Sequence, residues 1–81
     1  MTRDEAIGVV EKAHSAGEVR AEEAEPLDAE RCYIELIADR NTPGPIRNIL
    51  CWRVRYFNES GPVVDVYVEE PTGEIVRQER W

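Results

Sequence analysis

Two rows of apolar residues alternate with polar residues in the C-terminal half of the chain. The first row is Leu50, Trp52, Val54 and Tyr56, and the second row is Val64, Val66 and Val68. A period of two residues is typical of a β-strand with one buried face. A final strand segment follows the turn at Gly73. The pattern therefore predicts strands at about 49–57, 62–70 and 74–80.

The turn between the first two of these strands predicts their register. Glu59-Ser60-Gly61 suits a three-residue hairpin loop with a left-handed glycine, in which Asn58 faces Pro62. The paired residues are then Trp52 with Val68, Val54 with Val66, Tyr56 with Val64, Arg55 with Asp65, and Arg53 with Tyr67. A slip by one residue would set Val54 against Asp65 and is penalised. The inward residue of the last strand is left open between Ile75 and Val76.

The N-terminal segment has the period of a helix. Thr2 and Glu5 form a T-x-x-E capping box, in which each side chain satisfies an open backbone N–H group. Apolar residues then recur at helical spacing, and Gly17 is a natural C-terminal stop. We predict an amphipathic helix at about 3–16.

The middle of the chain is more ambiguous. Within residues 18–30, Val19 and Ala21 alternate with charged residues and could form a short edge strand, and Glu22 to Glu30 indicates a polar connection broken by Pro26. The segment RCYIELIADR fits a strand at about 31–38, in which Cys32, Ile34, Leu36 and Ala38 share one face, although a helix over 29–39 is the competing interpretation. The segment NTPGPIRN, residues 41–48, predicts a loop because two prolines and a glycine disfavour both helix and sheet.

These elements predict a single α+β domain spanning residues 1–81. One N-terminal helix packs on one face of a three- or four-stranded antiparallel sheet. The aromatic residues Trp52 and Tyr56 belong to the core beneath the helix, and Trp81 either folds back on the sheet or stays exposed as a contact.

The charge of the chain limits its partners. The formal net charge is −7, and the acidic excess is concentrated in residues 1–40. An acidic domain repels phosphate backbones, so we expect no nucleic-acid binding. The acidic half serves either for solvation or as a surface complementary to a basic partner. We expect no membrane association, because no apolar run reaches the ~20 residues that span a bilayer. The chain as given begins without a secretory signal and is expected in the cytoplasm, or exported if a signal was removed.

Few residues suggest chemistry. His14 is the only histidine, and the cysteines Cys32 and Cys51 lack the close spacing that anchors a metal site. We expect the two cysteines to be free thiols, with a disulfide bridge between neighbouring strands as the alternative. Ser15 adjoins His14, but adjacent residues on a helix do not face each other. We therefore predict no catalytic, cofactor-binding or metal site, and no enzyme activity.

The order of elements resembles the PepSY-like domain. The matching segments are DEAIGVVEKAH, YIELI, CWRVRYF and VVDVYVEEPTGEIV, with Trp52 and Thr72-Gly73-Glu74 as the nearest features to a motif. The family commonly has the sequence V-D-x-x-T-G before the turn, whereas Glu69 and Glu70 precede the turn here. The resemblance implies a helix packed on an antiparallel sheet, and a role in binding or inhibiting another protein.

The predicted function is that of a small non-catalytic protein-binding or inhibitory module of PepSY-like type. The alternative is an acidic immunity or inhibitor protein that neutralises a basic toxin or nuclease. The partner-binding residues are expected on the outer face of the sheet: Arg53, Arg55, Tyr67 and Arg77. Pairing within the sheet explains the arginines equally well, and a homodimer through this face or an edge strand is left open.

Overall fold

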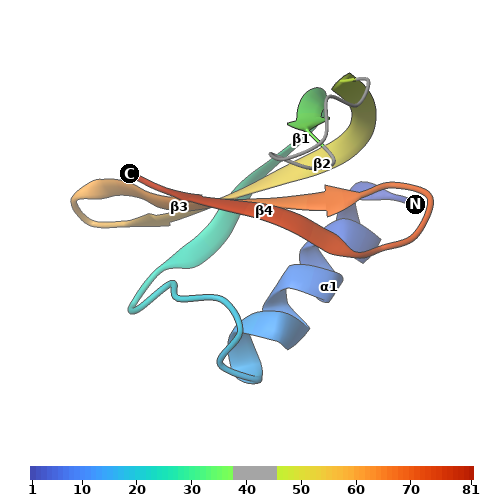
Figure 1. Cartoon of the computed structure of the whole chain (residues 1–81). Coiled ribbons are helices and arrows are strands. Elements are labelled where there is room, and N and C mark those ends of the chain that lie inside the picture. The colour runs from blue at the N-terminus through green and yellow to red at the C-terminus, as the bar shows by residue number, and fades with distance from the viewer. Residues whose placement is uncertain (38–45) are drawn as a thin grey trace.

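The computed structural model describes residues 1–37 and 46–81, which form one helix and a four-stranded antiparallel sheet. Helix α1 spans Arg3–Ser15, followed by β1 (Glu25–Ile37), β2 (Ile46–Asn58), β3 (Gly61–Glu69) and β4 (Ile75–Arg80). The strands lie in the order β1-β2-β3-β4, so that each pairs with its neighbour along the chain. Helix α1 lies against one side of this twisted sheet (Figure 1). The predicted α+β class is confirmed.

Helix α1 begins and ends as its local sequence predicts. The Thr2 N–H donates to the Glu5 carboxylate at 3.0 Å, and the Glu5 N–H donates to the Thr2 hydroxyl at 3.2 Å. At the other end, Gly17 has a φ of +80°, and the Glu18 N–H donates to the Ala13 carbonyl at 2.9 Å. This backbone bond is part of a Schellman motif, which needs the left-handed conformation that glycine adopts without strain. The helix is therefore limited by side-chain and backbone caps at both ends.

The main core lies between α1 and the sheet. Ala6, Val10 and Ala13 form the buried stripe of the helix, and they face the two predicted strand rows. Val54, Val66 and Val68 are fully buried at this interface. The edge strand considered for Val19 and Ala21 is absent, since residues 18–24 contain no strand. Val19 and Ala21 are buried instead, because this connection crosses over the end of the same core.

The predicted register between β2 and β3 is confirmed, but the turn between them is not. All five predicted pairs are present, from Trp52 with Val68 to Tyr56 with Val64. However, Asn58 pairs with Gly61 and Phe57 pairs with Pro62, so the expected partnership of Asn58 with Pro62 is wrong. The Ser60 N–H donates to the Asn58 side chain at 2.8 Å, which tightens the turn by one residue. An irregularity between Tyr56 and Phe57 absorbs this residue and keeps the apolar rows aligned.

Strand β1 is longer than predicted. It starts at Glu25 rather than near residue 31, and a bulge between Pro26 and Asp28 accommodates the proline that suggested a break. The competing helix over 29–39 is excluded for residues 29–37, which are strand. The predicted loop at 41–48 is wrong at its end, because β2 already begins at Ile46. Residues 41–45 and Ala38 lie outside the described part of the chain.

The outer face of the sheet carries a second apolar cluster. Ile34, Ile49, Cys51 and Tyr67 are buried there, and Cys32 and Val76 pack against them. Val76 therefore points to this face, while Ile75 packs on the helix side, so Ile75 is the inward residue of β4. The twist of the sheet helps to enclose the cluster, since the Arg77 guanidinium on β4 donates to the Glu35 carbonyl on β1 at 2.9 Å. The two edge strands thus approach each other across the outer face.

Candidate partner-binding surfaces

Arg55 is the most tightly held of the four predicted partner-binding residues. Its guanidinium makes two parallel hydrogen bonds to the Asp65 carboxylate, at 2.7 and 2.9 Å. The ring of Trp81 lies against the other side of Arg55, with 4.6 Å between the guanidinium carbon and the ring centroid. Such bidentate pairs are among the stronger side-chain interactions in proteins. Arg55 therefore positions Asp65 and the C-terminal tryptophan within the sheet.

The ion pair controls the charge state of Asp65. Only 4% of this residue is exposed, and burial alone raises the pKa of its carboxyl. The hydrogen bonds and positive charge of Arg55, with smaller contributions from Trp81 and Arg53, together outweigh that effect, so the pKa lies below its usual value. In return, the hydrogen bond to Asp65 raises the pKa of Arg55. Asp65 thus remains a charged structural group and is unsuited to donate a proton near neutral pH.

The other three predicted residues also make contacts within the chain. Arg53 reaches Glu30 at 2.9 Å and Asp28 at 3.5 Å, both on β1. Arg77 bridges from β4 to β1, and Tyr67 is buried beneath it in the outer cluster. The structure therefore brings all four residues to one face, as expected, and the three arginines each bond to groups within the sheet, although the Arg53 Nε is buried without a hydrogen-bond partner in the described structure. Trp81 was considered only as a residue that folds back or stays exposed; its ring lies against Arg55, and it is still 66% exposed.

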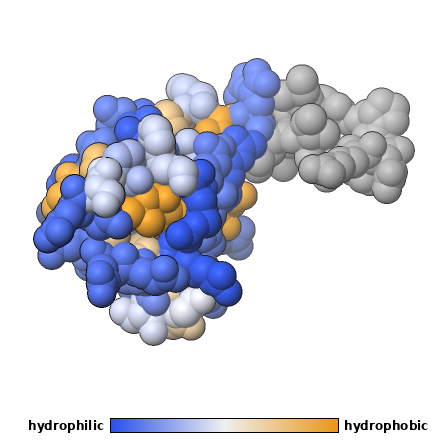
Figure 2. Space-filling model, turned by 90° about the vertical axis from the view of Figure 1, so that its left-hand side faces the viewer, coloured by the Kyte–Doolittle hydropathy of each residue, from blue (hydrophilic) through white to orange (hydrophobic). Residues whose placement is uncertain are grey.

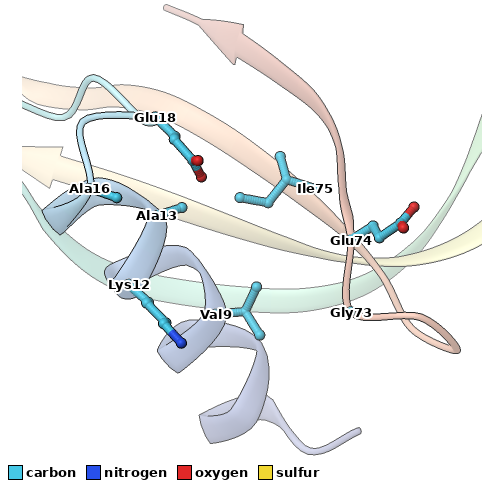
Figure 3. A pocket seen from close by; sticks show the side chains of 8 residues that line it. All are labelled: Val9, Lys12, Ala13, Ala16, Glu18, Gly73, Glu74 and Ile75. Atoms are coloured by element: carbon cyan, nitrogen blue, oxygen red, sulfur yellow. The ribbon is translucent and has the colours of Figure 1, made fainter.

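A groove separates the C-terminal half of α1 from the start of β4. Its volume is about 520 Å³, and its floor is formed by the small apolar residues Val9, Ala13 and Ala16 opposite Ile75. In Figure 3 the carboxylate of Glu18 points into this space, whereas Lys12 points away from Ile75. The helical spacing in the sequence predicted that Val9 and Ala13 lie on the helix. Only the path of β4 in the structure shows that Ile75 lies opposite them. The groove can accept an apolar side chain beside a carboxylate.

An acidic cleft lies at the end of the molecule where the β2–β3 turn meets the start of β1. It has a volume of about 650 Å³ and is lined by Glu23, Glu25 and Glu59 together with Leu27, Phe57, Ala24 and Asn58. Leu27 is 62% exposed, which is unusual for a large apolar side chain. Figure 2 views the molecule from this side and shows hydrophilic residues surrounding a central apolar area. The cleft contains no basic residue among its described lining.

The outward edge of β1 is unpaired within the described strands, since β2 is its only neighbour there. The Glu70 N–H donates to the Leu50 carbonyl at 3.0 Å, so the main chain of Leu50 faces β3 and that of Cys51 faces β1. By the same alternation, Cys32 pairs inward with Cys51, while the main-chain groups of Ala29, Arg31 and Tyr33 face away from β2. Glu35, two residues after Tyr33, also has main-chain groups that face away from β2, and its carbonyl accepts the hydrogen bond from Arg77. Among the described residues, the main-chain groups of Arg31 and Tyr33 are therefore available along this edge, whereas Ala29 is buried.

The groups that could carry chemistry are placed for packing. The ring of His14 meets Tyr56 edge to face at 5.5 Å between centroids, and burial raises the pKa of Tyr56 to about 12. The Tyr56 hydroxyl is buried without a hydrogen-bond partner in the described structure. In residues 1–37 and 46–81, no group of three or more His, Cys, Asp or Glu side chains could hold a metal ion. No helix among these residues is both long and apolar enough to span a membrane.

Comparison with known proteins identifies no relative: no family model, curated protein or solved structure matches this chain.

Proposed function

We propose that this chain is a small non-catalytic protein-binding module of PepSY-like type, which takes up an extended segment of a partner protein along β1. The unpaired edge of this strand carries the proposal. An extended segment added beside β1 would form main-chain hydrogen bonds with Arg31 and Tyr33, which are exposed, whereas Ala29 is buried. Because β1 has 13 residues, it can pair with a segment of several residues even where Arg77 occupies the Glu35 carbonyl.

The side chains beside this edge favour a partner segment with basic and aromatic or apolar residues. Tyr33 is 72% exposed and can pack against a neighbouring side chain of the added strand. Glu25 and Glu35 are exposed on the same strand and balance basic groups on a partner. Of the predicted contact residues, Arg77 lies on β4 and only its guanidinium reaches this edge, at the Glu35 carbonyl, whereas Arg53 pairs with β1 side chains from the adjacent strand.

The proposal can be tested with a proline at Tyr33. The Tyr33→Pro variant removes an outward N–H group and leaves the hydrogen bonds to β2 intact, since proline is tolerated on the open side of an edge strand. The matched control Tyr33→Ala removes the aromatic ring and keeps the N–H group. Affinity capture from the source cell should recover a partner with the wild type and with Tyr33→Ala, and lose it with Tyr33→Pro.

Two further measurements make the result decisive. Circular dichroism shows whether each variant is folded, and hydrogen exchange of the wild-type complex reports the Tyr33 amide directly. Protection of this amide on binding is expected if the partner adds a strand. Undiminished capture by folded Tyr33→Pro, or an unprotected Tyr33 amide in the complex, would contradict the proposal. Loss of capture by Arg53→Glu/Arg55→Glu alone would move the site to the outer face.

The acidic cleft supports a second candidate, an inhibitor or immunity protein that neutralises a basic toxin or nuclease. Glu23 and Glu25, two of the acids in the connection and the start of β1, are joined there by Glu59 from the β2–β3 turn. Glu30 is engaged with Arg53 and Glu18 lies at the α1–β4 groove, so these acids do not share the cleft. This candidate requires partner affinity to fall steeply with salt and to weaken in Glu23→Gln/Glu59→Gln. Salt-independent affinity would exclude it.

A further inference from the structure

Cys32 and Cys51 face each other directly across the middle of the β1–β2 ladder. Both are free thiols, and residues opposite each other in an antiparallel pair project to the same face of the sheet. Here that face is the outer one, where Cys51 is buried in the second apolar cluster and Cys32 packs against it. The sequence separates the two residues widely, and only the register of the strands brings them together.

The type of pair determines how close the two residues are. Since the main chain of Cys51 faces β1, Cys32 and Cys51 form a hydrogen-bonded pair, for which the Cα atoms lie about 5.5 Å apart. Disulfides in proteins most often join Cα atoms separated by about 5.5–6 Å. The Cβ atoms of opposed residues lie about 4.5–5.5 Å apart, somewhat further than the ~3.8 Å mean of a relaxed disulfide. A bond can therefore form after a small local shift, and it would be strained.

We propose that Cys32 and Cys51 are a disulfide-forming pair, which is oxidised reversibly by a small-molecule disulfide such as glutathione disulfide. The bond would tie β1 to β2 midway along the hairpin. Strained disulfides are more easily reduced than relaxed ones, so the bridge is suited to reversible formation. This site is independent of the β1 edge, because both side chains lie on the outer face of the sheet.

The two thiols have different roles because their exposure differs. Cys32 is partly exposed and makes the first attack: its thiolate bonds to one sulfur of glutathione disulfide and expels one glutathione thiolate. Cys51 is fully buried and resolves the adduct: its thiolate attacks the Cys32 sulfur and expels the second glutathione. The two cysteines lose two protons and two electrons in total, which leave with two molecules of reduced glutathione.

Burial makes the reaction of the two cysteines with glutathione disulfide slow, because it lowers the fraction of thiolate. Desolvation raises the pKa of both thiols, to about 11 for Cys51, so few thiolates are present near neutral pH. For Cys32, the nearby charge of Arg53 opposes this effect. The partly exposed Cys32 is therefore the expected site of entry for the oxidant.

The test is to incubate the folded protein with glutathione disulfide and follow its intact mass and thiol content. The wild type should lose two hydrogen atoms, expose no thiol to a maleimide after denaturation, and remain a monomer on a non-reducing gel. Cys51→Ser should accumulate one glutathione adduct, since it lacks the resolving thiol. Cys32→Ser should react several-fold more slowly than Cys51→Ser, because its remaining thiol is buried.

Two controls identify the route and the reversibility. The rate should be unchanged by urea well below the unfolding transition, and excess reduced glutathione should restore both thiols. A stable adduct on wild-type Cys32 without an internal bond would overturn the proposal. So would intermolecular dimers, a reaction that occurs only when urea unfolds the chain, or a bond that resists reduced glutathione.

Discussion

The Arg55–Asp65 pair makes a quantitative prediction about stability. Replacing Arg55 with alanine leaves the Asp65 carboxylate buried with one strong donor pair removed. Breaking a buried ion pair at one partner typically costs about 3–5 kcal/mol. Because 21% of the Arg55 side chain is exposed and part of its charge is therefore screened by solvent, we expect a loss of about 2–3 kcal/mol in the free energy of unfolding.

This loss should be visible because small domains have little stability in reserve. At roughly 0.05–0.15 kcal/mol per residue, a chain of 81 residues has about 4–12 kcal/mol in total. The variant should therefore stay folded but unfold at a clearly lower urea concentration. Urea titration followed by far-UV circular dichroism measures this shift without depending on Trp81, whose contact with Arg55 is also removed.

The pH dependence of stability tests the same reasoning, because lowering the pH should have opposite effects on the wild type and on Arg55→Ala. In the wild type, the pKa of Asp65 is lower in the folded state than its usual 3.8, so its contribution is present above about pH 4 and is lost as the pH falls through the folded pKa. In Arg55→Ala, burial dominates and raises the pKa, so protonation relieves the buried charge. The stability difference between the two proteins should therefore shrink between pH 7 and pH 3.

The double variant supplies the control. Arg55→Ala/Asp65→Asn removes the buried charge as well as its partner, and should be more stable than Arg55→Ala at pH 7. The reasoning would be refuted if Arg55→Ala unfolded at the wild-type urea midpoint. It would also be refuted if the deficit of Arg55→Ala stayed constant with pH, because the cost would then be loss of packing rather than an unpaired charge.

Three further predictions concern the core, the helix cap and association. Val54→Ala should lower the free energy of unfolding by about 2–3 kcal/mol, because it removes buried methyl groups from a fully buried position under α1. A loss below about 0.5 kcal/mol in a urea titration would contradict this packing. Thr2→Ala should cost about 1 kcal/mol by removing the capping hydroxyl, whereas Thr2→Ser should restore most of it in the same titration. If β1 edges pair between two copies, light scattering at micromolar concentration should give a dimer mass that Tyr33→Pro converts to a monomer; a monomer mass for the wild type would discard the homodimer.

Much of the fold was predictable because its signals are local. The capping box, the helical spacing before Gly17 and the alternating rows around Trp52 and Val66 each depend on neighbouring residues. The same alternation placed Arg55 opposite Asp65. By contrast, the start of β1 was missed because Pro26 is a strand breaker in most positions, and here an edge strand and a bulge accommodate it.

The outer face shows why the candidate sites were harder to predict. Its charged residues suggested a hydrated or partner-facing surface, yet four residues there are buried: Ile34, Ile49, Cys51 and Tyr67. Side-chain alternation indicates the face to which a residue points, but it does not indicate how strongly the sheet is twisted. That twist brings Arg77 to the opposite edge strand and decides which of these side chains contact water.

The sequence by itself therefore determined the helix, the apolar rows and the hairpin register that aligns these rows, since hydrophobic periods and caps act over a few residues, whereas the β2–β3 turn differs from the predicted loop. Only the tertiary structure decided which main-chain edge is open, which acids share a cleft, and that Cys32 and Cys51 are opposite each other. These relationships join residues that are distant along the chain. They depend on the pairing of whole strands and the coiling of the sheet, which no short segment encodes alone.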